Sequence, residues 1–396
     1  MMPDTATERR ALADRLQEAG VLTHPTWRAA VEAVPRELFL QPGVFLPTDG
    51  EHWRPVTALG TDPKEWSKIA YRDESLVTQL DGHLTADQAA EPVPGVPTSS
   101  STTPVTVIDM IEALDIEDGH TVLEIGTGTG YSTALMCHRL GEDNVTTIEV
   151  DPGVSARADA ALEAAGYSTW TVTGDGLLGH PRRAPYDHVI ATCAVRRIPH
   201  TWVRQTKPGG TILTTLAPGS WAYGTGLAKV AVNDDGTAEG RIIGESSFMQ
   251  ARSQAAVPLA GDLSARIAYA DSEREAKVAP TLLEEWMPAF LAQLATPGAQ
   301  LVRAARGDGT RQLYVFDTGR ESFAEFTENG SGWAVRQGGP LALWDDIEHA
   351  LTAWQAAGRP DISTVRLRVT PSSHTYWIDD RPALRWEHRL VCGRRR

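Results

Sequence analysis

The chain has 396 residues, 41% of them hydrophobic and 22% charged, which is typical of globular proteins and long enough for two or three domains. Its 37 basic and 51 acidic residues give a formal net charge of −14. This balance argues against a nucleic-acid partner, because binding a phosphate backbone needs clustered lysines and arginines. The three cysteines are widely spaced, so they form neither a disulfide framework nor a set of metal ligands, and we expect no metal site.

The amino-terminal residues are charged throughout and lack the apolar core of a secretion signal. No apolar run approaches the roughly 20 residues that a membrane span needs. The cysteine usage suits a reducing compartment. We therefore expect a soluble cytoplasmic protein without a membrane partner.

The first 97 residues are predicted to form a helical segment with an insertion and a linker. Helical spacing of apolar residues predicts one helix over residues 5–19 and a second over Pro25–Val34, which Pro35 stops. Residues 41–63 are rich in Pro, Gly and Trp and show no clear period, which favours an insertion or loop. A proline-punctuated linker is predicted over residues 91–97.

From Pro104 onward, predicted helices alternate with short apolar strands. The helices are expected over residues 105–114, 131–140, 155–165 and 200–206. The strands are expected over residues 121–125, 145–150, 168–173, 188–191 and 211–216. Such alternation implies right-handed crossovers and a mainly parallel, doubly wound α/β sheet. We assign this Rossmann-like domain to residues 98–225.

Residues 226–396 are predicted to form a separate α+β domain. A hairpin is expected through residues 233–236, an amphipathic helix over residues 281–294 and a second helix over residues 343–357. Further strands are expected over residues 312–316, 321–328, 332–337, 364–369 and 374–378. Four tryptophans are candidates for an aromatic binding face, and we expect at least half of them to belong to the core: Trp333, Trp344, Trp377 and Trp386.

A glycine-rich turn follows the first strand of the α/β domain. Gly126, Gly128 and Gly130 stand at alternate positions before a helix, where glycine permits a tight turn close to a ligand and the helix start supplies N–H donors. In a dinucleotide fingerprint the third glycine would stand at the position of Tyr131. Because the third glycine comes one residue early, the spacing disfavours NAD and favours a nucleoside with an amino-acid tail.

Acidic residues near the ends of the predicted strands support this interpretation. Glu149 is placed to accept the two ribose hydroxyls, and Asp175 to bind the adenine amino group or to stabilise an ordinary turn before Gly176. Glu124 is placed either to bind the ammonium group of the amino-acid tail or to cap the glycine turn. The complete predicted cofactor site is Glu124, Gly126, Thr127, Gly128, Gly130, Tyr131, Glu149, Asp175 and Gly176.

Five motifs occur in order along residues 8–218 and together resemble the protein-L-isoaspartate O-methyltransferase family. They occupy residues 33–39, 124–131, 174–176, 184–187 and 207–210. The resemblance implies a class I methyltransferase fold, S-adenosyl-L-methionine as cofactor with S-adenosyl-L-homocysteine as product, and esterification of a carboxylate in a peptide substrate.

Methylation of a carboxylate needs positioning more than a base, because a carboxyl group with a pKa near 4 is already ionised at neutral pH. In the resembled family a serine two residues before a proline orients the carboxylate. The matching position before Pro104 is Thr102, with Ser101 beside it, so either is the catalytic candidate. Candidate substrate-binding residues are Ser100, Thr103, Tyr71 and Arg72, although Arg72 also fits a surface salt bridge and Ser100 a flexible linker.

The additional carboxyl-terminal residues are similar to the actinobacterial branch encoded beside ribosomal peptides, including lanthipeptide, lasso-peptide and graspetide pathways. That resemblance implies methylation of an Asp in a constrained precursor, followed by aspartimide formation, with the carboxyl-terminal domain holding the peptide. Two alternatives stay open. One is repair of isoaspartyl residues in damaged proteins, and the other is a non-catalytic module that binds S-adenosylmethionine and a peptide.

Overall fold

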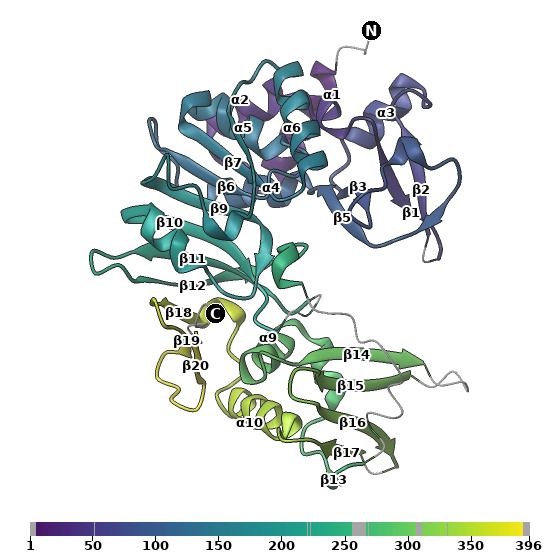
Figure 1. Cartoon of the computed structure of the whole chain (residues 1–396), viewed down its shortest axis with the longest axis vertical. Coiled ribbons are helices and arrows are strands. Elements are labelled where there is room, and N and C mark those ends of the chain that lie inside the picture. Colours follow the sequence, from purple (N-terminus) through teal and green to yellow (C-terminus); the bar gives the residue numbers. More distant parts are fainter. Residues whose placement is uncertain are drawn as a thin grey trace, which may run out of the picture. The chain divides into compact units, whose positions relative to one another are not determined.

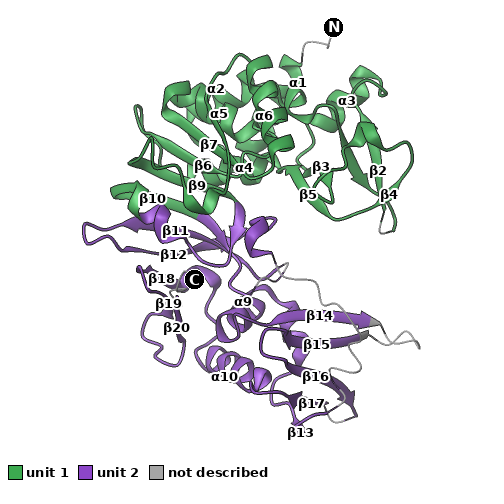
Figure 2. Cartoon of the chain, in the orientation of Figure 1, with its two compact units in different colours: residues 1–192, 204–213 green, residues 193–203, 214–396 purple. Residues whose placement is uncertain are grey.

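The computed structural model describes residues 5–50, 52–219, 221, 223–255, 267, 269–305, 311–330 and 332–390. The chain divides into two compact units (Figure 2). The first unit contains residues 1–192 and 204–213, and the second contains residues 193–203 and 214–396. No helix of the described residues is long and apolar enough to cross a membrane.

The first unit begins with the two predicted helices, which are confirmed. They are α1 (Ala6–Glu18) and α2 (Pro25–Ala33). The first turn of α2 starts with a proline, whose missing N–H would have no partner at that position. A 3-10 turn, η1 (Arg36–Leu40), follows. Helix α2 packs between α1 and α5 (Tyr131–Leu140), and these three helices lie together in Figure 1.

A five-stranded sheet occupies the region in which we predicted an insertion or loop and a linker, so this region is neither an irregular loop nor an unstructured linker. Its strands, β1 (Gly43–Pro47), β2 (His52–Thr57), β3 (Leu76–Leu80), β4 (Val93–Pro94) and β5 (Pro97–Ser101), lie in the order β4-β2-β1-β3-β5. Helix α3 (Pro63–Ala70) and turn η2 (Ala86–Gln88) connect them. Phe45, Val77 and Leu80 form a small core under the sheet. Among the prolines that suggested a loop or linker, Pro63 begins helix α3 and Pro94 stands on edge strand β4, where a missing N–H is tolerated.

The predicted doubly wound α/β sheet of the first unit is confirmed. Its strands are β6 (Val122–Ile125), β7 (Val145–Glu149), β8 (Trp170–Thr173), β9 (Tyr186–Val195) and β10 (Thr206–Leu216). Helices α4 (Pro104–Glu112) and α6 (Pro152–Ala164) belong with α5 to the first unit, whereas α7 (His200–Gln205) consists mostly of residues assigned to the second unit.

The strand order of this sheet is β8-β7-β6-β9-β10. Strand β6 pairs in parallel with β7 on one side and with β9 on the other. The strand order therefore reverses at β6, and ligands of such sheets bind at the carboxyl ends of the strands beside this point. The glycine-rich turn follows β6 at that place.

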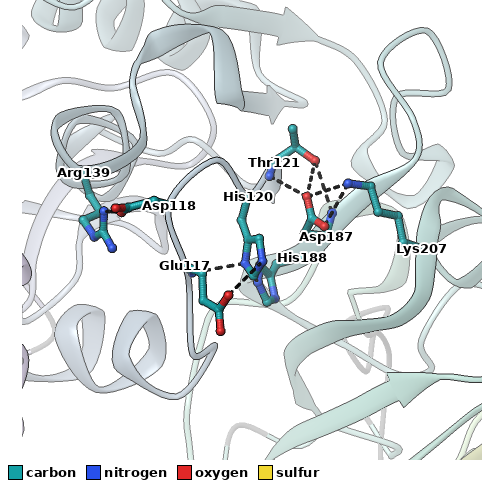
Figure 3. Close-up of polar contacts among 8 residues, drawn as sticks. All are labelled: Glu117, Asp118, His120, Thr121, Arg139, Asp187, His188 and Lys207. Atoms are coloured by element: carbon teal, nitrogen blue, oxygen red, sulfur yellow. Dashed lines mark hydrogen bonds and ion pairs between the residues drawn. The ribbon is translucent and has the colours of Figure 1, made fainter.

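A cluster of polar side chains lies at the opposite edge of this sheet, where strands β6 and β9 begin (Figure 3). The Oδ2 atom of Asp187 accepts hydrogen bonds from the backbone N–H (2.8 Å) and hydroxyl (2.9 Å) of Thr121. The ammonium group of Lys207 lies 2.9 Å from both oxygens of Asp187. The rings of His120 and His188 meet beside this pair, with 2.9 Å between Nδ1 and Nε2. This cluster joins the starts of two neighbouring strands.

Replacing Asp187 with Asn should lower the free energy of unfolding at neutral pH. Burial tends to raise the pKa of Asp187, but the hydrogen bonds from Thr121 and Lys207 hold it at about 2. Because the folded-state pKa lies below the ordinary value, the stabilisation is complete above pH about 4 and is lost as the pH falls toward about 2. Because solvent screens the half-exposed Lys207, the shift corresponds to about 1–2 kcal/mol at pH 7, measurable by urea unfolding.

The matched control is Asp118→Asn, which removes an exposed ion pair with Arg139 worth about 0–1 kcal/mol. The difference between D187N and wild type should shrink as unfolding is repeated at lower pH. Equal stability of D187N and D118N at pH 7 would contradict the assignment.

The second unit contains a sheet in the order β20-β19-β18-β12-β11. The predicted hairpin is confirmed as β11 (Gly226–Val232) and β12 (Ala238–Glu245), and the predicted closing pair as β18 (Val365–Val369) and β19 (Ser373–Ile378). Edge strand β20 (Arg385–Arg389) was not predicted.

A second, antiparallel sheet of this unit has the order β13-β17-β16-β15-β14. Its strands are β13 (Ser272–Glu275), β14 (Gln300–Ala305), β15 (Arg311–Asp317), β16 (Ser322–Asn329) and β17 (Gly332–Gly338). The helix predicted over residues 281–294 is split into a 3-10 turn, η6 (Pro280–Glu284), and α9 (Trp286–Ala295). Helices α9 and α10 (Leu343–Ala356) pack together.

The four candidate tryptophans do not form one aromatic face. Trp344 is fully buried against Phe326 and belongs to the core. Trp333 stands on β17, whereas Trp377 and Trp386 stand on the other sheet of the unit. Trp386 pairs with buried Tyr376 and therefore points to the face opposite Trp377.

Candidate active site

The turn between β6 and α5 has the conformation that its glycines permit. Gly126, Gly128 and Gly130 have φ values of +94°, +55° and +88°, a region that residues with a Cβ atom rarely occupy. The backbone N–H groups of Gly126 and Thr127 donate to the carbonyl oxygen of Ile148, at 2.8 and 3.2 Å. The turn is thus fixed to the end of β7.

Glu124 lies beneath this turn and is fully buried. Its carboxylate accepts hydrogen bonds from the hydroxyls of Ser132 (2.5 Å), Thr133 (2.5 Å) and Thr147 (2.8 Å). Burial raises the pKa of Glu124, and these hydroxyl donors oppose the rise. Because the Thr147 proton goes to Glu124, Thr127 must donate to Thr147 across their 2.7 Å contact.

These contacts favour a structural part for Glu124 over contact with a ligand. The predicted alternative was a cap on glycine N–H groups, but the donors are hydroxyls of α5 and β7. Glu124 therefore holds the start of α5 against the sheet.

Glu149 stands at the end of β7 and is nearly buried. Its Oε2 accepts from the backbone N–H of Gly128 and its Oε1 from that of Asp151, both at 3.0 Å. Each carboxylate oxygen has a second lone pair, so Glu149 can still accept two ligand hydroxyls. Gln79 of β3 donates to the carboxylate of Asp151 at 3.3 Å and so connects the two sheets of this unit at the site.

Asp175 follows β8 and is exposed. One carboxylate oxygen caps turn η4 (Gly176–Leu178) by accepting from the N–H of Leu177 at 2.9 Å. Asp175 therefore stabilises the turn before Gly176, and its other carboxylate oxygen has no hydrogen-bond partner among the described residues. Gly176 packs on Ile125, the last residue of β6, so closely that a Cβ atom would collide with the Cγ2 atom of Ile125.

The predicted hydroxyl run is an ordered strand, β5, and not a flexible linker. Strand β5 pairs antiparallel with β3, and Thr78 donates to the Ser99 hydroxyl at 3.1 Å. The carbonyl oxygen of Ser100 lies 3.5 Å from the position that a Cβ atom would take at Gly128. The hydroxyl strand therefore ends directly beside the glycine turn.

The structure separates the two catalytic candidates. Ser101 is buried, and its hydroxyl faces the guanidinium group of Arg36 at 3.5 Å. Thr102 is half-buried and is held through its backbone, because its carbonyl oxygen accepts from Arg36 at 3.2 Å. The Thr102 hydroxyl has no hydrogen-bond partner among the residues that the structure describes. Of the two, Thr102 is free to meet a ligand.

Three predicted substrate-binding residues have other partners. Tyr71 is buried and donates to Glu37, with Thr5 at 3.3 Å from its hydroxyl. Burial and the Glu37 charge raise the pKa of Tyr71, so it belongs to the core and not to a cleft wall. Arg72 forms an exposed ion pair with Glu74 at 3.7 Å.

Thr103 is likewise engaged, because its hydroxyl donates to Asp73 at 2.5 Å. The same Asp73 oxygen accepts from the N–H of Val105 at 3.0 Å and caps the start of α4. Tyr131, predicted at the cofactor, is also buried, with its ring against Phe39 and near the guanidinium group of Arg36. Burial raises the pKa of Tyr131 to about 12.

Comparisons with known proteins agree with this geometry. The family model described as protein-L-isoaspartate(D-aspartate) O-methyltransferase matches residues 63–255. A protein-L-isoaspartate O-methyltransferase of Ignicoccus hospitalis is 34% identical over 205 residues, which are 51% of this chain and 79% of that protein. One of Thermococcus onnurineus is 30% identical over 251 residues, which are 63% of this chain and 91% of that protein.

The chain belongs to the protein-L-isoaspartate O-methyltransferase family. Its members are carboxyl O-methyltransferases that depend on S-adenosyl-L-methionine. A solved structure titled protein-L-isoaspartate O-methyltransferase shares the fold with a TM-score of 0.53 and 21% identity, over 97% of this chain and 99% of that one. The resemblance found from the motifs is thus confirmed at the level of the family, and the likeness in fold extends into the second unit.

The residues at the switch point fit the S-adenosylmethionine of this methyltransferase family. Gly128 leaves a space that a side chain would fill, Glu149 keeps spare acceptor capacity, and exposed Asp175 keeps one oxygen without a partner among the described residues. Glu149 and Asp175 would hold the ribose and the base. Glu124 would not touch the cofactor but would support the turn through its hydrogen bonds to α5 and β7. When bound, the cofactor supplies an electrophilic methyl group. The chain's own part is to aim a carboxylate that is already ionised.

Sequence reasoning missed two residues of this methyltransferase site. Arg36 lies within the motif of residues 33–39 but was not assigned a role. It is fully buried and donates to backbone carbonyls, including that of Thr102. Gln79 stands on a strand with no motif around it and accepts from Thr98 at 2.9 Å while it binds Asp151. A buried arginine and a buried glutamine give no signal in composition or spacing.

Replacing Thr102 with Ala should lower kcat about tenfold to a hundredfold, because one hydrogen bond to a charged group contributes about 1.5–3 kcal/mol. Thr102→Ser keeps the hydroxyl and should stay near wild type. Ser101→Ala should change kcat less, since its hydroxyl faces Arg36. Methyl transfer to an isoaspartyl peptide measures kcat, and calorimetry should show unchanged affinity for S-adenosylhomocysteine. A larger loss in S101A than in T102A would reverse the assignment.

Proposed function

We propose that this chain transfers the methyl group of S-adenosylmethionine to the free carboxylate of an isoaspartyl residue in a polypeptide. The observation that carries the proposal is the meeting of β5 with the glycine turn, where the Ser100 carbonyl lies beside Gly128. Thr102 follows two residues later, and its hydroxyl has no hydrogen-bond partner among the described residues. A hydroxyl that binds one carboxylate oxygen leaves the other to attack. No proton needs to be removed, because the carboxylate is ionised at neutral pH.

The names of the relatives support isoaspartyl residues of proteins as the substrate, which would make the activity one of repair. The methyl ester formed there is attacked by the nitrogen of the following peptide bond. A carbon–nitrogen bond forms, methanol leaves and a succinimide results. Hydrolysis of the succinimide returns part of the material to the ordinary aspartyl form.

A second candidate substrate is an aspartyl side chain of a constrained, ribosomally synthesised peptide, with the succinimide as the final product. It is supported by the alignment lengths, since the family model ends at residue 255 and leaves most of the second unit unmatched. The solved structure that spans 97% of this chain also carries the isoaspartate name, which weighs toward the repair substrate.

Labelled S-adenosylmethionine and three peptides test these proposals together. The peptides are an isoaspartyl peptide, its ordinary aspartyl twin and a macrocyclic peptide with an internal Asp-Gly. Label on the isoaspartyl peptide alone supports repair. Label on the macrocycle alone, followed by loss of methanol in the mass spectrum, supports the biosynthetic substrate. No label on any peptide, with S-adenosylhomocysteine still bound, would favour a non-catalytic module and overturn both.

A further inference from the structure

A row of cations crosses the outer face of one sheet in the second unit. Directly paired residues of antiparallel strands point to the same face, and the pairing runs without interruption from β11 through β12, β18 and β19 to β20. The residues of this row, which we call the cationic row, are Lys229, Arg241, Arg366, Trp377 and Arg385. Arg241, Arg366 and Arg385 are exposed.

The neighbouring row on the same face is built differently. There Glu239 pairs with Arg368, so that opposite charges stand across from each other, and Thr375 pairs with Glu387. In the cationic row, by contrast, Arg241 stands directly between Lys229 and Arg366. Like charges directly opposite one another destabilise a sheet. The cationic row is therefore not explained by stability of the sheet.

The cationic row already binds one carboxylate that belongs to the chain itself. Asp379 accepts from Nε of Arg366 at 3.0 Å and from the indole nitrogen of Trp377 at 2.9 Å. Arg385 lies over the ring of Trp377 at 5.8 Å from the centroid. Arg241 and Arg385 form no ion pair with any residue that the structure describes. Two guanidinium groups on this face are thus open to external anions.

We propose that the cationic row docks an acidic, extended segment of a polypeptide partner. Strands lie about 4.8 Å apart, so the row extends about 19 Å, the length of about six extended residues. Carboxylates at alternate positions of such a segment lie about 7 Å apart, within reach of successive long cationic side chains. Trp377 supplies an apolar surface between the arginines.

A polypeptide fits this face better than a nucleic acid does. Glu239 and Glu387 stand in the row beside the cations and would repel a continuous phosphate backbone, whereas an acidic peptide offers separate charges. The chain as a whole carries −14, which also opposes a polyanion outside this row. The inference concerns docking alone and holds whichever carboxylate is methylated.

The test is binding of a fluorescein-labelled peptide of alternating Glu and Gly, about twelve residues long, to the full chain by fluorescence anisotropy. The double variant R241Q/R385Q should bind up to about thirtyfold more weakly, because it loses two exposed ion pairs with the peptide. Added salt should weaken wild-type binding and affect the variant less. The matched control R10Q/R182Q removes two exposed arginines of the first unit and should bind as wild type does.

Thermal unfolding separates docking from a structural role. Because Arg241 stands directly between Lys229 and Arg366, the single substitution R241Q relieves repulsion within the row, and its unfolding midpoint should equal or exceed that of wild type. A lowered midpoint would assign the row to the stability of the sheet and overturn the proposal. Equal peptide affinity of the two double variants would also overturn it, as would tighter binding of a single-stranded DNA of the same length.

Discussion

Replacing Arg36 with Met should lower the free energy of unfolding by about 3–5 kcal/mol and remove methyl transfer. The guanidinium group is fully buried and donates to the carbonyl oxygens of Arg72 (2.7 Å), Ala70 (2.8 Å), Thr102 (3.2 Å) and Glu74 (3.2 Å). A methionine would leave these acceptors without a donor, and each unsatisfied buried group costs about 1–3 kcal/mol. Burial lowers the pKa of Arg36 to about 10, so it is charged at neutral pH.

We expect Arg36 to be a positioning residue, because it donates to the backbone carbonyl of Thr102, the residue that we propose orients the substrate carboxylate. Arg36→Lys keeps the charge but not the planar fork that serves several carbonyls at once. We expect R36K to fold, to bind S-adenosylhomocysteine as wild type does and to lose kcat with little change in KM for the cofactor. Urea unfolding and steady-state kinetics measure both effects. Wild-type stability of R36M, or a loss of cofactor affinity in R36K equal to the loss of kcat, would contradict this role.

The part of the fold that follows from local signals could be predicted from the sequence. Helix α5 begins and ends at the predicted residues, Tyr131 and Leu140, because glycines bracket a helical pattern. The parallel sheet could also be predicted from local signals, because each of its strands and helices shows its own spacing of apolar residues along the sequence. The position of the glycine turn at the switch point then follows from topology alone.

The sheet of residues 43–101 could not be found in this way, because its strands are short and pair over long separations. Phe45 of β1 pairs with Val77 of β3, for example, and the pair formed by β1 and β2 includes Pro47 and Pro55. A proline within a short segment indicates a turn unless the partner strand is known. The hydrophobic core that stabilises this sheet includes Phe45 and Leu80, which are likewise far apart in the sequence.

The candidate site likewise has a part that the sequence predicts and a part that only the structure shows. The residue types at the turn and at the strand ends were predictable, but their hydrogen bonds were not. Glu124 meets Thr147 because β6 and β7 pair in a particular register, which places these two residues directly opposite each other. Tyr71 meets Glu37 through the packing of η1 beside α3. A polar residue beside a motif therefore suggests a ligand contact until the register shows that another side chain satisfies it.

Replacing Glu149 with Gln should weaken binding of S-adenosylhomocysteine about tenfold to a hundredfold, and Glu149→Ala should weaken it by about a hundredfold or more. The carboxylate already accepts from Gly128 and Asp151, so the ribose hydroxyls would use its remaining lone pairs. A hydrogen bond to a charged group contributes about 1.5–3 kcal/mol, and each 1.4 kcal/mol is tenfold in affinity. The amide of Gln keeps one acceptor and loses the other. Titration calorimetry measures both variants.

Asp175→Asn is the comparison variant, because Asp175 is exposed and water competes with the cofactor for its second carboxylate oxygen. We expect D175N to weaken binding less than E149Q does. In E149Q, kcat at saturating S-adenosylmethionine should recover toward wild type, because in the role expected for it Glu149 would hold the cofactor and would not touch the carboxylate that is methylated. A stable E149A that binds S-adenosylhomocysteine within about twofold of wild type, well under the tenfold that 1.4 kcal/mol represents, would show that Glu149 serves only to fix Gly128 and Asp151. The ribose would then be held elsewhere along the carboxyl edge of the sheet.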